Sequence, residues 1–267
     1  MTSTGRRSRT SGAAAACSAA LLLLTPAARA GEAESLLLPG IDLAGVEFKV
    51  GAWCRYLVVD EAMGERDSSS VYLAIVGREK TASGSAYWLE IESGPEGADE
   101  ADREVARALV DERVRAMAEG DSLYHYISRL YIRKGRGPVE AGDPRDLKRL
   151  TIVSPTSETD WQIEAGQVVA TPAGELTCEL RRFEKDESRD IPTGRVMLKQ
   201  RRVDRVQVWV APAVPVFHLA KCEIDRTRES RTVPPVRGIP DAGPKRSRTT
   251  STLVAYGEGA KPLLSIP

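Results

Sequence analysis

The side chains best suited to catalysis are two histidines and the cysteines that follow the N-terminal segment. His218 precedes Cys222 by four residues, within a stretch of alternating apolar residues that is typical of a strand. Residues four apart on a strand share a face but lie about 13 Å from each other, which is too far for a histidine to activate a cysteine. His125 lies between two tyrosines in another strand-like stretch. Both histidines are therefore predicted to be structural.

The cysteines beyond the N-terminal segment are Cys54, Cys178 and Cys222. An odd number permits one internal disulfide and leaves one thiol over, and an oxidising compartment favours such a bridge. Three unbridged, buried side chains are the alternative, because free cysteine is commonly buried. The spacing does not select a pairing. No Cys-x-x-Cys pair occurs, so we predict neither a metal site nor a cofactor.

Carboxylates are plentiful, and Asp60, Glu90 and Glu92 lie in strand-like stretches, where they are candidates for a paired acid and base. A solvated face is the more common role for such charges. The sequence has no Gly-x-Ser-x-Gly, His-Glu-x-x-His or P-loop motif. We therefore predict no catalytic residue and a protein that is not an enzyme. A carboxylate-dependent envelope hydrolase is kept as an alternative.

Charge gives no reason to expect a nucleic-acid partner. Basic and acidic residues number 38 each, so the formal net charge is zero. The arginines between residues 226 and 248, with Lys245, are candidates for anion binding, and a solvated linker is the alternative. Glu229 and Asp241 dilute their charge and no aromatic residue lies among them, which disfavours nucleic acid. Residues 227–251 are polar, contain four prolines and lack apolar periodicity. This segment is predicted to be a flexible insertion.

The N-terminus has the three parts of a secretory signal peptide. Arginines precede an apolar stretch, residues 13–24, and Ala28-Arg29-Ala30 is a small-x-small cleavage site. An uncleaved membrane anchor is the alternative, but the apolar stretch is too short to span a bilayer. We predict a signal peptide at residues 1–30 and one β-rich domain at 31–267. The protein is expected to be periplasmic or secreted and at most peripheral to a membrane.

We therefore expect the exported protein to begin at Gly31. Measuring the intact mass of protein recovered after export tests this directly. A mass that includes Met1 to Ala30, or a lipid attached to Cys17, would contradict it, because both require that the signal peptide is not removed at Ala30.

Period-two alternation and Gly/Pro-containing turns predict a mainly β fold of about ten antiparallel strands. Two stretches share a strand, proline turn, strand pattern: residues 168–180 and 206–224. Residues 99–119 are predicted to be a helix, from apolar residues spaced three to five apart and a following glycine. The predicted strands are 46–60, 71–77, 86–92, 123–134, 147–153, 161–170, 175–183, 195–203, 205–211, 216–224 and 252–256.

Several of these strands carry apolar residues on both faces. A sheet of this kind needs two covers. One cover is expected to be the predicted helix, and the other is a second internal layer, a protein partner or a lipid. The candidate ligand-binding residues are Trp53, Trp88, Trp209 and Phe217, because an indole offers a large apolar surface and one hydrogen-bond donor.

Four pieces of the chain resemble periplasmic lipoprotein carriers of the LolA/LolB superfamily: GAWCRY at 51–56, TPAG at 171–174, VWVAP at 208–212 and LVAYG at 253–257. The resemblance is loose and extends over most of the mature chain. It implies an antiparallel half-barrel that wraps around one or two helices, with an apolar cavity for acyl chains. It also implies a lipid or an acylated protein as the partner.

The leading hypothesis is therefore a non-enzymatic periplasmic protein that binds a lipid or lipoprotein. Burial of acyl chains against apolar strand faces would provide the affinity, at about 25 cal/mol per Å². An envelope interaction or structural module, whose second apolar face meets a protein partner, is the main alternative.

Overall fold

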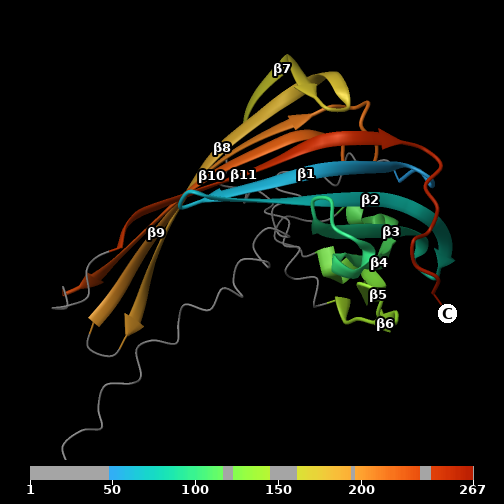
Figure 1. Ribbon diagram of the computed structural model, residues 1–267, viewed down its shortest axis with the longest axis horizontal. Helices are drawn as coiled ribbons and strands as arrows, with labels where there is room; N and C mark the ends of the chain where they lie inside the picture. Colours follow the sequence, from blue (N-terminus) through green and yellow to red (C-terminus); the bar gives the residue numbers. More distant parts are fainter. Residues whose placement is uncertain (1–47, 117–122, 145–160, 194–195, 235–241, 267) are drawn as a thin grey trace, which may run out of the picture.

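The computed structural model describes residues 48–116, 123–144, 161–193, 196–234 and 242–266. These residues form one antiparallel sheet of 11 strands in the order β6-β5-β4-β3-β2-β1-β11-β10-β9-β8-β7 (Figure 1). The strands are β1 (Trp53–Ala62), β2 (Glu65–Thr81), β3 (Gly84–Pro95), β4 (Glu104–Asp111), β5 (Ile127–Lys134), β6 (Glu140–Ala141), β7 (Gln162–Thr171), β8 (Gly174–Thr193), β9 (Val196–Val210), β10 (Leu219–Val233) and β11 (Ala242–Gly257).

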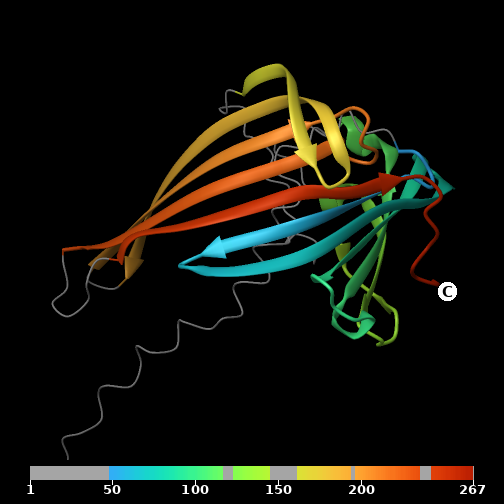
Figure 2. The same cartoon turned by 45° about the horizontal axis from the view of Figure 1, so that its top comes forward.

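The sheet is open, with β6 and β7 as its two edges. It curls strongly, so that β3 to β6 turn beneath β1 and β2, while the far ends of β8 to β11 extend away from the body of the molecule (Figures 1 and 2). The prediction of a mainly β, antiparallel and unclosed sheet is confirmed. The helices that it was expected to wrap around are not found in the described residues, whose only helices are the short 3-10 turns η4 (Glu100–Asp102), η5 (Glu112–Ala116) and η6 (Leu123–Tyr126).

Alternation along each strand divides the sheet into two faces. In β1, Cys54, Tyr56 and Val58 are buried in the larger apolar cluster, and we call their side of the sheet the inner face. Trp53 packs against a smaller cluster on the opposite side, which we call the outer face. This two-sided burial is the pattern that the alternating sequence predicts.

Both proline turns lie where the sequence predicts them. Residues 171–174 join β7 to β8, and residues 211–218 join β9 to β10. In the longer turn the N–H of Ala211 donates to the carbonyl of His218 at 2.7 Å, which closes the connection. Proline fixes its own φ and restricts the residue before it, so these turns are encoded locally.

The predicted helix at residues 99–119 is wrong. Residues 104–111 form β4, which lies between β3 and β5, and 112–116 form the 3-10 turn η5. Val105 and Leu109 face outward while Ala108 and Val110 face the inner cluster, and all four are buried. A strand buried on both faces has a nearly continuous apolar run, which resembles helical spacing in the sequence.

The predicted flexible insertion at 227–251 is also wrong wherever the structure describes it. Residues 227–233 continue β10 and 242–251 belong to β11, and the two strands pair with each other. Residues 235–241 lie outside the described residues, as does the strand predicted at 147–153. The two strands predicted at 195–203 and 205–211 are one continuous strand, β9.

After β11, residues 258–266 cross the outer face of β3 and β4; we call this segment the C-terminal strap. The Glu90 carboxylate accepts hydrogen bonds from the backbone N–H groups of Leu263 at 2.7 Å and Leu264 at 3.1 Å. Arg107 Nη1 donates to the carbonyl of Leu264 at 2.8 Å. The Leu264 side chain is buried, so the strap is held by both apolar packing and charged partners.

Burial raises the pKa of Glu90, and the two N–H groups and Arg107 act in the opposite direction. No helix among the described residues is long and apolar enough to cross a membrane.

Candidate functional site

Two of the predicted ligand-binding residues lie beneath the C-terminal strap or beside it. Trp88 is buried on the outer face, where the guanidinium groups of Arg107 and Arg129 lie 4.8 and 4.9 Å from its ring. Trp53 packs against Tyr72, with ring centroids 5.8 Å apart. Both indoles belong to the outer apolar cluster. The second cover predicted for this face is therefore partly supplied by the chain itself.

The other two predicted residues lie near the connection between β9 and β10. Trp209 is half-buried on β9, with the Lys221 ammonium 5.1 Å from its ring. Phe217 is buried in the inner cluster within the turn. The four residues are not brought together around one space, and none of them lines either of the two pockets described below.

The three cysteines are all free and buried. Cys54 lies in β1, Cys178 in β8 and Cys222 in β10, and no two of these strands are neighbours in the sheet. The disulfide alternative is therefore not found in this structure. Burial raises the pKa of the Cys54 thiol to about 12 and also raises that of Cys222, so these thiols are not nucleophiles near neutral pH.

The candidate carboxylates do not converge. Asp60 lies on the inner face and accepts a hydrogen bond from Thr249, whereas Glu90 lies under the strap on the outer face. Glu92 forms an ion pair with Arg103 at 2.9 Å. His218 Nδ1 lies 2.7 Å from the carbonyl of Val214 within the turn, in agreement with a structural role. Among the described residues, no group of three or more acids, histidines or cysteines could hold a metal ion.

A different set of residues gathers on the extended part of the sheet. Arg228 of β10 lies directly opposite Arg202 of β9 and Lys245 of β11. Opposite residues on antiparallel strands have Cβ atoms about 4.5–5.5 Å apart, and like charges at this spacing repel each other. We call these three residues the cation row. An anion bound between them would relieve the repulsion, because it supplies opposite charge at the shortest distance.

A buried ion pair supports the cation row from the neighbouring positions of the same face. Asp204 accepts hydrogen bonds from Arg226 Nε at 2.8 Å and from Arg202 Nε at 2.7 Å. The Asp204 and Arg226 side chains are 8% and 9% exposed. Asp204 therefore orients Arg202 and neutralises Arg226, since charge-assisted hydrogen bonds fix the direction of a guanidinium group.

The surrounding inner face is mainly basic. On the inner face, the ends of β8 to β11 that extend away from the body of the molecule carry six basic and two acidic side chains. The basic ones are Lys185, Arg189, Arg202, Arg226, Arg228 and Lys245, and the acidic ones are Glu187 and Asp204. A cavity of about 250 Å³ lies here, lined by Glu187, Arg189, Gln200, Arg201, Arg202, Arg228, Glu229 and Ser230. The lining combines four arginines with two glutamates and two neutral polar side chains, and Lys245 does not line it. The guanidinium groups are the part of this lining that suits an anion.

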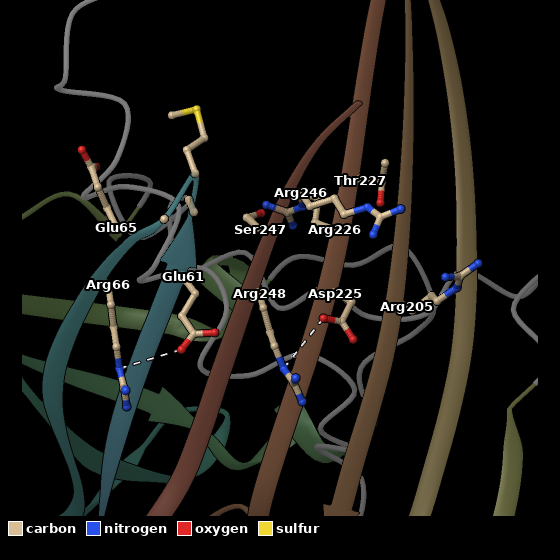
Figure 3. Close-up of a pocket in the computed structure, with 13 residues that line it drawn as sticks. Glu61, Glu65, Arg66, Arg205, Asp225, Arg226, Thr227, Arg246, Ser247 and Arg248 are labelled. Carbon is tan, nitrogen blue, oxygen red and sulfur yellow. Dashed lines mark ion pairs between the residues drawn. The ribbon is translucent and has the colours of Figure 1, made fainter. Parts of the chain in front are cut away.

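A larger cavity of about 570 Å³ lies beside the β1–β2 turn (Figure 3). Its charges alternate in sign from strand to strand. Arg66 pairs with Glu61 at 3.9 Å and Arg248 with Asp225 at 3.8 Å, as Figure 3 shows. Arg205, which also lines it, pairs with Glu184 at 2.7 Å. Opposite charges on adjacent strands stabilise the sheet, so the charges of this cavity have a structural explanation. In the cation row, Arg202 likewise has Glu187 of β8 opposite it and a hydrogen bond to Asp204, whereas the register places Arg228 between two other cations.

Arg228 and Lys245 belong to the stretch whose basic residues were predicted either to bind anions or to be solvated, but Arg202 was not connected with them. Arg202, Arg228 and Lys245 are far apart in the sequence, and only the register of β9, β10 and β11 brings them together. The available signal was the alternation of basic residues at 226, 228, 246 and 248, which fits the period of a strand.

No family model matches the chain, and no curated protein matches it. Among solved structures, a "putative lipoprotein" from Parabacteroides distasonis aligns with 10% identity and a TM-score of 0.36, over 82% of this chain and 99% of that one. A "putative exported protein" with a YmcC-like fold from Bacteroides fragilis aligns with 11% identity and a TM-score of 0.33, over 84% and 100%. What this chain binds is therefore inferred from its own residues.

Proposed function

We propose that this protein is an exported, non-enzymatic binding protein that takes an anionic, phosphate-bearing ligand at the cation row. The observation that supports this most directly is the register of Arg202, Arg228 and Lys245, which places three cations side by side on one face. Like charges at neighbouring positions repel each other, and the acidic partners Glu187 and Asp204 lie beside Arg202 at one end of the row. A function in anion binding explains why the chain contains the row.

The chemistry of the row suits a phosphate group. A guanidinium group presents its donors as a rigid fork that matches phosphate oxygens, and an ammonium group adds a point charge. Arg202 is held in place by Asp204 at 2.7 Å, so less conformational entropy is lost when it binds. Arg228 and Lys245 are exposed, and a ligand can reach them from solvent.

Phosphate groups occur both in lipid headgroups and in soluble molecules, and the cation row recognises what the two have in common. The lipid source agrees with the lipid partner predicted from the sequence and with the signal peptide expected at residues 1–30. The hydrolase alternative has less support, because Asp60 and Glu90 lie on opposite faces of the sheet.

We expect R228Q with K245Q to weaken phosphate-ligand binding by about 30- to 1000-fold, because each removes a charged partner worth about 1–2 kcal/mol and each 1.4 kcal/mol is tenfold in affinity. Isothermal titration would use three probes: inorganic phosphate, a water-soluble short-chain phosphatidic acid, and an uncharged short-chain diacylglycerol. Binding of both phosphorylated probes indicates headgroup chemistry alone. Binding of phosphatidic acid alone indicates a lipid.

The matched control is R205Q, which removes another exposed arginine, one that pairs with Glu184 on the outer face. It should leave binding unchanged. The proposal fails if neither phosphorylated probe binds, or if R205Q and the double variant lose affinity equally.

A further inference from the structure

The far end of the β8–β9 hairpin, together with the neighbouring end of β10, is apolar. Ile191 lies opposite Leu198, and Pro192 lies opposite Met197, which in turn lies opposite Val233 of β10. Ile191 and Val233 are each 40% exposed. We call these five residues the apolar tip. Figures 1 and 2 show that this end of β8, β9 and β10 projects well away from the rest of the sheet.

Both faces of the apolar tip are apolar, because Ile191 and Leu198 lie on the inner face and Pro192, Met197 and Val233 on the outer face. The residues just before it are charged on both faces, as in Arg189 and Asp190. The chain therefore changes from a polar, ion-paired ladder to apolar residues at the pairs Ile191/Leu198 and Pro192/Met197, beyond which Thr193 pairs with Val196. A projecting element that is apolar on both sides is typical of insertion into an apolar medium rather than of packing against one surface.

The chain next to the apolar tip is basic. In the described residues 187–193, 196–202, 228–234 and 242–246, eight side chains are basic and three are acidic, a net charge of +5. Basic residues behind an apolar tip complement an anionic lipid surface, where each one adds to the attraction. If two copies of the protein met tip to tip, their positive charges would come together and repel each other. This repulsion disfavours a second copy of the chain as the partner of the tip.

We propose that the apolar tip inserts into the surface of an anionic lipid bilayer, with the basic residues behind it contacting the phosphate groups. The five residues of the apolar tip are not part of the cation row, although three of the eight basic residues behind the tip are, so variants of the tip test this inference separately from the proposed function. Insertion by the tip would hold the cation row close to lipid headgroups, which are its expected ligands.

The test is vesicle flotation with the exported protein. Vesicles containing phosphatidylglycerol and phosphatidylcholine should carry the protein, and vesicles of phosphatidylcholine alone should carry much less. Changing Met197→Asp and Leu198→Asp should reduce the vesicle-bound fraction at least about tenfold, because the tip would then bring charge into the bilayer. Val168→Asp is the matched control. Val168 of β7 is 66% exposed and lies opposite Thr177 of β8 rather than opposite a basic residue, so this change should have no effect.

A second measurement reports how deeply the apolar tip enters the bilayer. L198W should show a blue-shifted indole emission with anionic vesicles and quenching by brominated lipid, while the same protein in buffer should not. Titration of the M197D/L198D variant with short-chain phosphatidic acid keeps the two proposals apart, since the cation row is intact in it. The inference is overturned if wild type does not float, if the tip variant floats as wild type does, or if the indole is not quenched.

Discussion

Replacing Asp204 by alanine should lower the free energy of unfolding by about 3–5 kcal/mol, the cost of removing one partner from a buried ion pair. Asp204 and Arg226 are both almost fully buried, and the Arg226 guanidinium has Asp204 as its neutralising partner at 2.8 Å. Without the carboxylate, a buried cation would remain beside Arg202. Urea unfolding followed by circular dichroism measures the change.

Asp186 provides a matched control, because Arg201 contacts both of its carboxylate oxygens, at 2.6 to 3.1 Å, but the Asp186 side chain is 42% exposed. D186A should be much less destabilising than D204A, since exposed ion pairs are weak. Equal losses in D204A and D186A would show that burial of the Asp204 pair does not matter to stability.

The same carboxylate predicts a pH dependence. Burial alone would raise the pKa of Asp204, but the hydrogen bonds from Arg202 and Arg226 outweigh it and hold the pKa below its ordinary value. The stabilising contribution is therefore complete above the unfolded-chain pKa, about 4, and is lost as the pH falls through the lowered native pKa. The difference in unfolding free energy between wild type and D204N should shrink on acidification below about pH 4. A difference that grows on acidification would contradict this sign.

The second large effect is expected at the C-terminal strap. Leu264→Ala should lower the free energy of unfolding by about 2–5 kcal/mol, as for other buried leucines. Leu264 is 1% exposed, and its backbone N–H and carbonyl are held by Glu90 and Arg107. Loosening of the strap would also expose Trp88, so the intrinsic fluorescence of the native state should shift to the red.

Leu263 is the control within the same strap. Its side chain is 39% exposed, and it contributes to the strap through its backbone N–H bond to Glu90, which alanine keeps. L263A should therefore cost less than about 1 kcal/mol. If L263A and L264A are equally destabilising, the strap is not anchored by burial of Leu264. If neither destabilises, the strap contributes little to the fold.

One physical cause explains why residues 104–111, which were predicted to be helical, form a strand, and why residues 53–62 were recognised as a strand. In β1 the outer-face residues are mostly half-buried and the alternation is visible. In β4 almost every residue is buried, because the strap covers its outer face while the larger cluster covers its inner face. Burial on both sides removes the polar positions on which period-two recognition depends.

The ends of β10 and β11 that extend away from the body of the molecule show a different reason why the sequence did not predict strands. Their residues are polar, so no burial pattern identifies them as strands. Their pairing instead brings opposite charges together, as in Arg248 with Glu223 at 2.6 Å. Cross-strand partners are defined by register, and register is not visible in a single sequence. The cation row depends on this register too, so the sequence alone could not bring its three residues together.

The sequence by itself determined the features that depend on neighbouring residues. Alternation specified most of the strands, and Pro172 and Pro212 specified two of the turns, because the constraints on proline act within one or two residues. The tertiary structure alone decided what covers each face and which charges meet. Glu90 and Leu264 are 174 residues apart, and their contact exists only because the curled sheet brings the end of the chain back across β3.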